Sequence, residues 1–470
     1  MHNSDIQGPV KMSPRSRLLL IIGLYFFISA AQLFALQVST AIVKIVDTIG
    51  GIEYLSVAFT AIMMGAAVMS PIAGKLSDLF GRRRVLFIGV LVLFLSELLG
   101  IFVQNIFQFI AIAGIQGIGG GFAITVSLIV IADVCSTEER AKYIGYYGSL
   151  MAGLVIFGPL LGGVIVDNFN WNWIFVTLMP FSLIGGILIF KFMPDIPRSE
   201  NTKIDYLGSF LITAAIVLTV LITVVGGKQY PWGSPTILIM CALAVISFVS
   251  FILVEKRSTN PIMSMSIFSN FTFTLCFIAC FLIIMAGVAI SYYFPVYVQK
   301  VRGMTPTDSG MFLACRGVLA FFVSAFNGWV ISRIKEYRWN ALVTVLLMCA
   351  ALFSFYMMDA QTSVFMIILT IVFVGLAGAY NNIFHIGAQM SLPNNLIVPA
   401  MGAMQLAVAF GATLGNVLYG LFLRTPDIGV GIKNLFLCSF VISLVVVVCI
   451  IALLLDRGKA QKSAVSHISK

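Results

Sequence analysis

Charged side chains are scarce in this sequence, at 10% of its 470 residues, whereas hydrophobic side chains make up 60%. Such a composition argues against a soluble domain and is typical of a chain that crosses a membrane many times. Acidic residues are fewer than basic ones, 18 against 28, so the formal net charge is +10. That excess raises the question of a nucleic-acid partner, which the placement of the charges answers.

The basic residues follow a membrane topology pattern. Six lie in segments expected on the outer side, Arg316 lies within an apolar segment, and the others lie in segments expected in the cytoplasm. We therefore expect both termini in the cytoplasm, a lipid bilayer around the chain and no nucleic-acid partner. The six outer residues are Lys44, Lys228, Lys300, Arg302, Arg424 and Lys433.

Several chemical motifs are missing. The sequence has no P-loop, zinc-ligand set or catalytic triad, so it predicts neither an enzyme nor a bound cofactor or metal. Energy for work across a membrane would then come from an ion gradient rather than from ATP. The cysteines lie mostly in apolar runs, and although Cys276 and Cys280 share a helix face, no nearby histidine or carboxylate completes a zinc site. Buried free thiols are the prediction.

Fourteen apolar segments reach the length of roughly 20 residues that a spanning helix needs. The first, at about thirty residues, is too long for the core of a signal peptide. The longest polar breaks, 194–203 and 255–270, divide the segments into six, two and six. The segments lie near 18–43, 54–74, 85–104, 107–132, 143–166, 173–193, 205–226, 234–254, 270–297, 307–332, 339–358, 362–388, 397–422 and 434–455.

We therefore expect an all-α membrane protein with fourteen transmembrane helices. Two six-helix pseudo-repeat halves would flank a central two-helix hairpin, with a substrate path between the halves near the midplane. The expected parts are a cytoplasmic tail 1–16, an N-terminal bundle 17–200, a linker hairpin 201–262, a C-terminal bundle 263–457 and a cytoplasmic tail 458–470.

A polar stretch, Gly-Lys-Leu-Ser-Asp-Leu-Phe-Gly-Arg-Arg-Arg at residues 74–84, separates the second and third apolar segments, and we expect it to be a short loop. Gly74 lets two helix ends approach closely, and Gly81 permits a tight turn. Asp78 can accept hydrogen bonds from an arginine or a helix N-terminus. A generic basic loop would explain Arg82–Arg84 but not the Gly-x-Leu-x-Asp-x-x-Gly frame before them.

This frame resembles the loop 2–3 signature of the major facilitator superfamily of secondary transporters. The resemblance implies a gating role for Asp78, Arg82 and Arg83, which would lock and release the cytoplasmic side. Other segments resemble the fourteen-helix drug:proton antiporter branch of that superfamily. They are 171–175, 203–208, 254–257, Asn260-Pro261, and Gly402 with Gly411 and Gly415.

The fifth apolar segment carries Gly158-Pro159-Leu-Leu-Gly162-Gly163. Proline kinks a helix, and glycines let a neighbouring helix pack against the bend. The combination resembles the antiporter signature of the family and implies export rather than uptake, although Leu154 stands where the family often has glycine. Glycine and proline are also simply common in membrane helices.

Two positions depart from the antiporter pattern. Ala113 stands where the family has the arginine implicated in proton coupling, and Ser39 stands near the position of an intramembrane aspartate. A coupled proton would therefore need another carrier, and an ionisable residue inside a membrane is a functional candidate. Glu97 and His385 are the candidates, His385 because an ordinary histidine pKa is near ~6.5. Asp133, beside a cytoplasmic loop, is expected to be structural.

Polar and aromatic residues in the apolar segments form the expected substrate-binding set. Arg316 would bind an anionic group, or pair with Glu97 or a backbone carbonyl. For Gln37, contact with the substrate cavity and a structural hydrogen bond are equally weighted. Each other residue has the same structural alternative. The full set is Gln37, Gln116, Tyr292, Arg316, Asn382 and His385.

These patterns predict a transporter, most simply a monomer in a bacterial plasma membrane, that exports drug-like or amphipathic small molecules by alternating access in exchange for protons. A first alternative keeps the fold but carries an anionic, zwitterionic or lipid-like solute, with different or no proton coupling. A second alternative is a membrane sensor or scaffold that transports nothing.

Overall fold

The computed structural model describes residues 12–51, 54–194, 206–226, 230–231, 233–257, 265–334, 336–378, 380–393, 396–425 and 427–468. These residues are almost entirely helical, and long apolar sequence accounts for that, because backbone groups within a bilayer must find hydrogen-bond partners in their own segment. The expected boundaries near 200 and 262, and the stretches 203–205 and 260–261, lie outside the described residues.

The first six helices pack on one another around α1 and α4, and we call them the N-group. Each corresponds to one expected apolar segment. Their bounds are α1 Pro14–Ile49, α2 Leu55–Phe80, α3 Arg82–Gly100, α4 Ile106–Val134, α5 Thr137–Asn168 and α6 Trp173–Phe192.

A hairpin of two helices follows, and then a second group, which we call the C-group, packs around α9. The hairpin consists of α7 Tyr206–Val225 and α8 Pro235–Arg257. The C-group consists of α9 Phe271–Val288, α10 Phe294–Val296, α11 Pro306–Ile334, α12 Arg338–Met357, α13 Val364–Leu376, α14 Tyr380–Met390, α15 Ile397–Phe422 and α16 Ile428–Ile468.

The expected loop at 74–84 is wrong. Helix α2 continues to Phe80 and α3 begins at Arg82, so only Gly81 lies between them. Gly81 has a φ of 90°, a left-handed conformation that glycine adopts without a Cβ clash. The polar residues before it continue the helix because their backbone hydrogen bonds do not depend on apolar side chains.

Three further expected helices in the C-group have different limits. The segment 270–297 continues to Val301 through π-helical turns at Ala289–Tyr293 and Tyr297–Val301, on either side of Pro295. The segment 362–388 is broken into α13 and α14 at Ala377 and Gly378. Helix α16 runs to Ile468, so the expected tail 458–470 is helical over its described residues.

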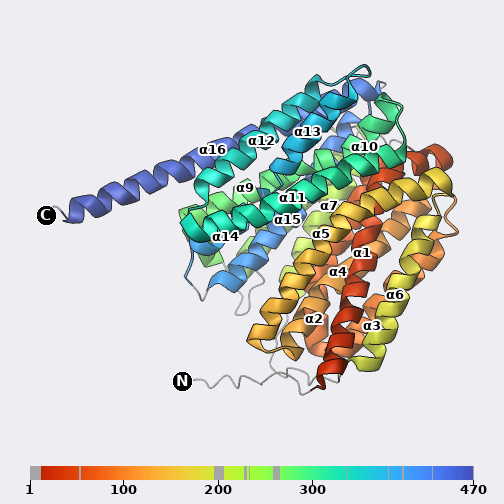
Figure 1. The fold of residues 1–470 in the computed structure, drawn as a ribbon, viewed down its shortest axis with the longest axis horizontal. Helices are drawn as coiled ribbons and strands as arrows, with labels where there is room; N and C mark the ends of the chain where they lie inside the picture. Colours follow the sequence, from red (N-terminus) through yellow and green to blue (C-terminus); the bar gives the residue numbers. More distant parts are fainter. Residues whose placement is uncertain are drawn as a thin grey trace.

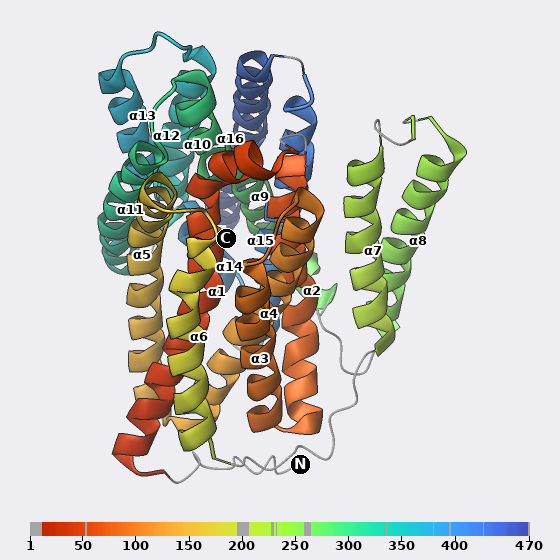
Figure 2. The same cartoon turned by 90° about the vertical axis from the view of Figure 1, so that its right-hand side faces the viewer.

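The two groups meet and diverge along their length, as Figure 1 shows with α5 and α11 side by side. We name the two ends of the molecule after turns of the N-group. The Gly50 end carries the α1–α2 turn, and the Gly81 end carries the α2–α3 turn. Figure 2 shows the α7–α8 hairpin beside α2, at the edge of the bundle.

Within the described residues, ten helices are long and apolar enough to cross a membrane, and eleven if both parts of the bent α2 form one span. The structure therefore supports a multi-pass membrane protein without giving the count of fourteen. All eight cysteines are free thiols, as predicted, but only four of them are buried, and Cys315 is exposed.

Candidate functional site

The expected gating residues come together at the Gly81 end. Arg82 pairs with Asp78 one helical turn before it, and its Nε lies 3.0 Å from the carboxylate of Asp133 at the end of α4. Arg82 also donates to the Ser77 hydroxyl at 2.7 Å. One guanidinium thus joins α2, α3 and α4.

A second set of polar contacts lies at the same end. Arg17 of α1 makes a two-pronged ion pair with Glu139 of α5 at 2.7 and 2.8 Å. Arg83 donates to the carbonyl of Phe190 in α6 and lies over its ring, 5.6 Å from the centroid. All of these contacts lie within the N-group. They stabilise one group rather than joining the two.

The α5 motif lies where the two groups meet, near the Gly50 end. A Cβ added at Gly162 would lie 2.4 Å from the backbone oxygen of Gln37 in α1, and one added at Gly163 would lie 2.5 Å from that of Pro306 in α11. The packing is mutual, because a Cβ added at Gly310 of α11 would lie 2.5 Å from the carbonyl oxygen of Pro159 in α5. Helix α5 is therefore packed between α1 and the C-group at backbone distance.

Gly158 completes the motif on the α1 side. A Cβ added there would lie 2.7 Å from that of Leu36. The Thr40 hydroxyl of α1 also donates to the Pro159 carbonyl at 2.8 Å. Each of the four motif residues thus has a partner in α1 or α11. Glycine and proline that were present only because they are common in membrane helices would not all need such partners.

Polar contacts between the groups surround this packing. Gln299 donates to the Thr40 carbonyl at 2.8 Å, and Lys300 lies 2.5 Å from Asp47. Asp167, at the end of α5, accepts from the backbone N–H of Thr307 at 2.8 Å. That N–H belongs to the first turn of α11, where helix N–H groups lack internal partners and a negative charge is favourable.

Arg316 lies in the middle of α11 and faces the π-helical turn of the preceding span. Its guanidinium donates to the Ser291 hydroxyl at 3.2 Å. The neighbouring Tyr292 ring lies 4.5 Å from that of Phe59 in α2, centroid to centroid. Among the described residues, no carboxylate lies within ion-pair distance of Arg316. A half-buried arginine inside a membrane without an acidic partner is costly, and such residues usually mark a ligand or ion path.

Glu97 lies elsewhere. Its side chain is 0% exposed between α3 and α6, where Ser182 donates a hydrogen bond to it. The other carboxylate oxygen has no hydrogen-bond partner in the described part of the chain. The pairing of Arg316 with Glu97 that the sequence allowed is therefore wrong, because each has a different partner in a different group.

The other expected substrate residues are spread over several helices. Gln37 is buried in α1, and Thr177 donates to its side-chain oxygen at 3.5 Å, a marginal bond. Gln116 is 2% exposed, and neither of its amide atoms has a partner among the described residues. On α14, His385 is half-buried and Asn382 is exposed. The structure places Tyr292 and Arg316 of this set beside one another, since Arg316 donates to Ser291, the residue before Tyr292.

Sequence reasoning missed the residues of α11 and its preceding span that meet the N-group. Gly310 and Gly317 lie two helical turns apart and both pack on α5, a spacing that signals a small-residue stripe. Pro295 was the available signal for the π-helical turns, which often occur at functional sites. Nothing local to Asp167 indicates that it reaches α11.

Comparison with known sequences identifies the family. The model of the Major Facilitator Superfamily matches residues 18–416. The multidrug transporter protein MdtP of Bacillus subtilis is 30% identical over 405 residues, which cover 86% of this chain and 75% of that protein. Multidrug resistance protein 3 of Bacillus subtilis is 26% identical over 401 residues, covering 85% and 78%.

Solved structures agree on the fold. The peptide transporter POT in complex with sulfate superposes with a TM-score of 0.68 at 15% identity, over 94% of this chain and 96% of that one. A bacterial homolog of the human lysosomal transporter Spinster, in an inward-facing and unoccupied conformation, gives 0.68 at 12% identity, over 93% and 97%. This chain belongs to the Major Facilitator Superfamily, whose members are membrane transporters and not enzymes.

Proposed function

We propose that this protein exports drug-like, amphipathic small molecules by alternating access between the N-group and the C-group. The observation that carries the proposal is the contact of α5 with α11. The groups touch at backbone distance near the Gly50 end, whereas the ion pairs that the described residues make at the Gly81 end stay within the N-group. The multidrug relatives support the class of cargo.

The proposal includes an orientation. Arg82–Arg84 and Arg17 lie at the Gly81 end, so the positive-inside rule favours that end as cytoplasmic, with both termini on the same side. The structure would then represent an inward-open state. A bacterial plasma membrane, a monomer and fourteen spans are parts of the same proposal. The span count treats α9 to Val301 as one span and α13 with α14 as another.

The division into parts is also proposed rather than measured. The N-terminal bundle would cover 17–200, the linker hairpin 201–262 and the C-terminal bundle 263–457. Packing supports it, since most helices of α1–α6 and of α9–α16 pack within their own set, while α5 with α11 and α2 with α15 form the main contacts between the sets, and α7 packs chiefly with α8. The gating role of Asp78, Arg82 and Arg83 requires a second state, in which the Gly81 end closes.

Protons are the proposed coupling ion, with His385 and Glu97 as carriers. His385 is half-buried on α14, in the C-group. Glu97 is buried in α3, in the N-group. Among the described residues, its only hydrogen-bond partner is Ser182. Because Glu97 is fully buried, loading and unloading of a proton there would require a change that opens its surroundings.

A second candidate cargo is anionic or zwitterionic, and Arg316 favours it. Its guanidinium has a serine hydroxyl but no carboxylate partner among the described residues. A substrate carboxylate or phosphate could supply the missing charge through a two-pronged hydrogen bond. Tyr292 beside it offers a flat aromatic surface for the apolar part of the same molecule.

The test uses purified protein in sealed vesicles that contain a pH dye. Under an imposed proton gradient, lipophilic cations, neutral compounds and organic anions are added in turn to the wild type, Arg316→Gln and Arg316→Lys. Proton movement evoked by cations supports the multidrug proposal. Movement evoked only by anions, lost in Arg316→Gln and partly kept in Arg316→Lys, supports the second cargo. Absence of movement and of labelled-compound uptake across the whole panel rejects both.

A further inference from the structure

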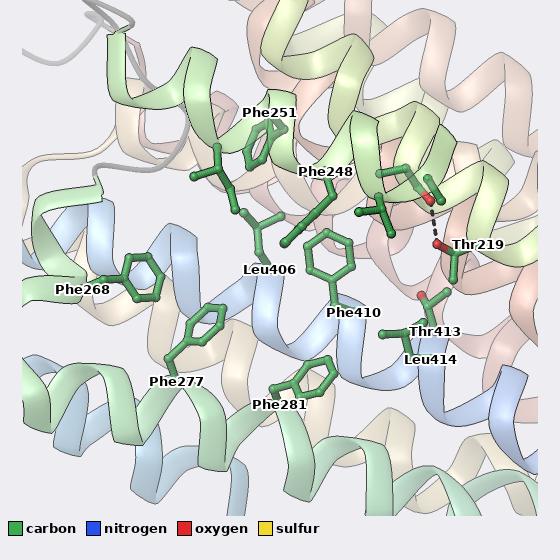
Figure 3. A pocket seen from close by; sticks show the side chains of 14 residues that line it. Thr219, Phe248, Phe251, Phe268, Phe277, Phe281, Leu406, Phe410, Thr413 and Leu414 are labelled. Carbon is green, nitrogen blue, oxygen red and sulfur yellow. Dashed lines mark hydrogen bonds between the residues drawn. The ribbon is translucent and has the colours of Figure 1, made fainter. Parts of the chain in front are cut away.

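An apolar cavity of about 630 Å³ lies between the α7–α8 hairpin and the C-group (Figure 3). Helices α7, α8, α9 and α15 and the 3₁₀ turn Met265–Ser269 all contribute to its wall. Phenylalanines line much of it: Phe248, Phe251, Phe268, Phe277, Phe281 and Phe410. Protein interiors are close-packed, so a space of this size is too large to be a packing defect.

Among the described residues that line it, the cavity offers a ligand no free hydrogen-bond donor. Its two hydroxyls belong to Thr219 and Thr413, and each already donates to a carbonyl one turn earlier in its own helix, at 2.7 and 2.8 Å. Sites for small molecules usually combine an apolar wall with a few convergent polar groups that fix orientation. This wall lacks them, which favours an occupant made of hydrocarbon alone.

The cavity is also continuous with the lipid-facing surface of α8. Val245 and Phe248 line it and are 61% and 47% exposed, while Phe251 deeper in the wall is 2% exposed. Leu243 and Ile246 on the same helix are exposed as well. In a membrane these exposed side chains contact lipid tails, so the opening of the cavity faces the bilayer rather than water.

We propose that the cavity holds an acyl chain of a bilayer phospholipid, which fills the contact between the hairpin and helices α9 and α15. The hairpin has a small core of its own, formed by Ile222, Ile237 and Ala244. Helix α7 also packs against α2 of the N-group. The hairpin thus lies against both groups. An acyl chain would fill the space between the hairpin and the C-group without hydrogen bonds, so it would not oppose movement of the two groups relative to each other.

The head group has a place in the same arrangement. Helix α8 runs from the α7–α8 turn toward the Gly81 end of the molecule (Figure 2). A phospholipid with its tail between α8 and α15 would have its phosphate near that end of the helix.

The test uses the full-length protein in vesicles of phosphatidylethanolamine and phosphatidylglycerol, with a diazirine at the end of one acyl chain of the phosphatidylglycerol. After irradiation, mass spectrometry should find labelled peptides containing Phe248 and Phe251 of α8 and Leu406 and Phe410 of α15. Ala244→Trp, which fills the cavity, should lower labelling of the α15 peptide at least fivefold. Ile246→Trp adds the same side chain to the outer face of α8 and should leave it unchanged.

Leu406→Trp fills the cavity from the opposite wall and serves where Ala244→Trp disturbs the hairpin core, as judged by thermal unfolding. Equal labelling of the α15 peptide in the wild type and in a folded cavity-filling variant would overturn the proposal. So would labelling confined to the outer face of α8. A photoreactive amphipathic cation that labels these peptides and displaces the lipid would assign the cavity to a drug-like ligand instead.

Discussion

The two ends of this transporter differ in where their contacts are made. At the Gly50 end, Gly163 and Gly310 bring α5 and α11 together, and Asp167 reaches the first turn of α11. At the Gly81 end, Arg82 joins α2, α3 and α4 of one group only. The same polar chemistry therefore joins the groups at one end and stabilises a single group at the other.

The glycines of α5 show the difference within one helix. Those in its first half have no atom within 4 Å of an added Cβ, as at Gly145, Gly148 and Gly153, whereas Gly158, Gly162 and Gly163 are tightly packed. Helix α11 repeats the pattern in reverse, with Gly317 packed and Gly328 open. Closed packing at one end with open space at the other is the geometry that alternating access requires of one of its states.

The largest effect is expected from Gly163→Leu. The added side chain must displace the Pro306 backbone, and overpacking of this kind costs about 1–3 kcal/mol. That cost falls on the state seen here, so transport of labelled substrate into vesicles should decrease at least tenfold. Val164→Leu, on the neighbouring residue with 38% exposure, adds bulk at an exposed position and should transport normally. Equal transport rates for both variants would contradict close packing between α5 and α11.

A smaller effect is expected from Asp167→Asn. Removing a negative charge from the N-terminus of α11 costs about 0.3–1 kcal/mol, and the loss again falls on the closed Gly50 end. Accessibility of residues at that end to a membrane-impermeant thiol reagent should increase two- to fivefold. Asp308→Asn is the matched control, because Asp308 caps the same helix through Thr305 within the C-group. An increase of the same size in both variants would assign the effect to helix stability alone.

The sequence predicted those features that depend on residues close together in the chain, and missed those that depend on residues far apart in it. Apolar length located most of the long helices, and the α5 motif predicted close packing, because both are local properties of one helix. The loop at 74–84 was wrong since helical hydrogen bonds continue through polar residues to Gly81. The contact of Asp167 with Thr307 joins positions 140 residues apart, and no local pattern determines such a pairing.

Glu97→Gln tests a third region, the buried contact between α3 and α6 within the N-group. The amide keeps the size of the side chain and the contact with Ser182, so the thermal unfolding temperature should stay within a few degrees of the wild type. If Glu97 carries the proton, the dependence of export on the imposed pH gradient should be lost while binding of substrate persists. A pH dependence identical to that of the wild type would leave Glu97 with a structural role and His385 as the remaining candidate.

The smallest effect on the balance of states is expected from Arg82→Gln. The substitution leaves the carboxylates of Asp78 and Asp133 without their shared partner, which destabilises the N-group by about 1–3 kcal/mol. The unfolding temperature should fall, while thiol accessibility at the Gly50 end should not change in the state described here. A rise in that accessibility would mean that Arg82 acts across the groups in this state.

The most direct test of alternating access measures both ends at once. Spin labels are attached in a cysteine-free variant that still transports. One label pair replaces Gln104 and Gln361 at the Gly50 end, and the other replaces Ile144 and Trp329 at the Gly81 end. Pulsed electron paramagnetic resonance then gives the distance within each pair in lipid nanodiscs. When substrate and pH are varied, the account predicts that the first distance lengthens as the second shortens. Distances that move in the same direction, or that never change while the protein transports, would contradict it.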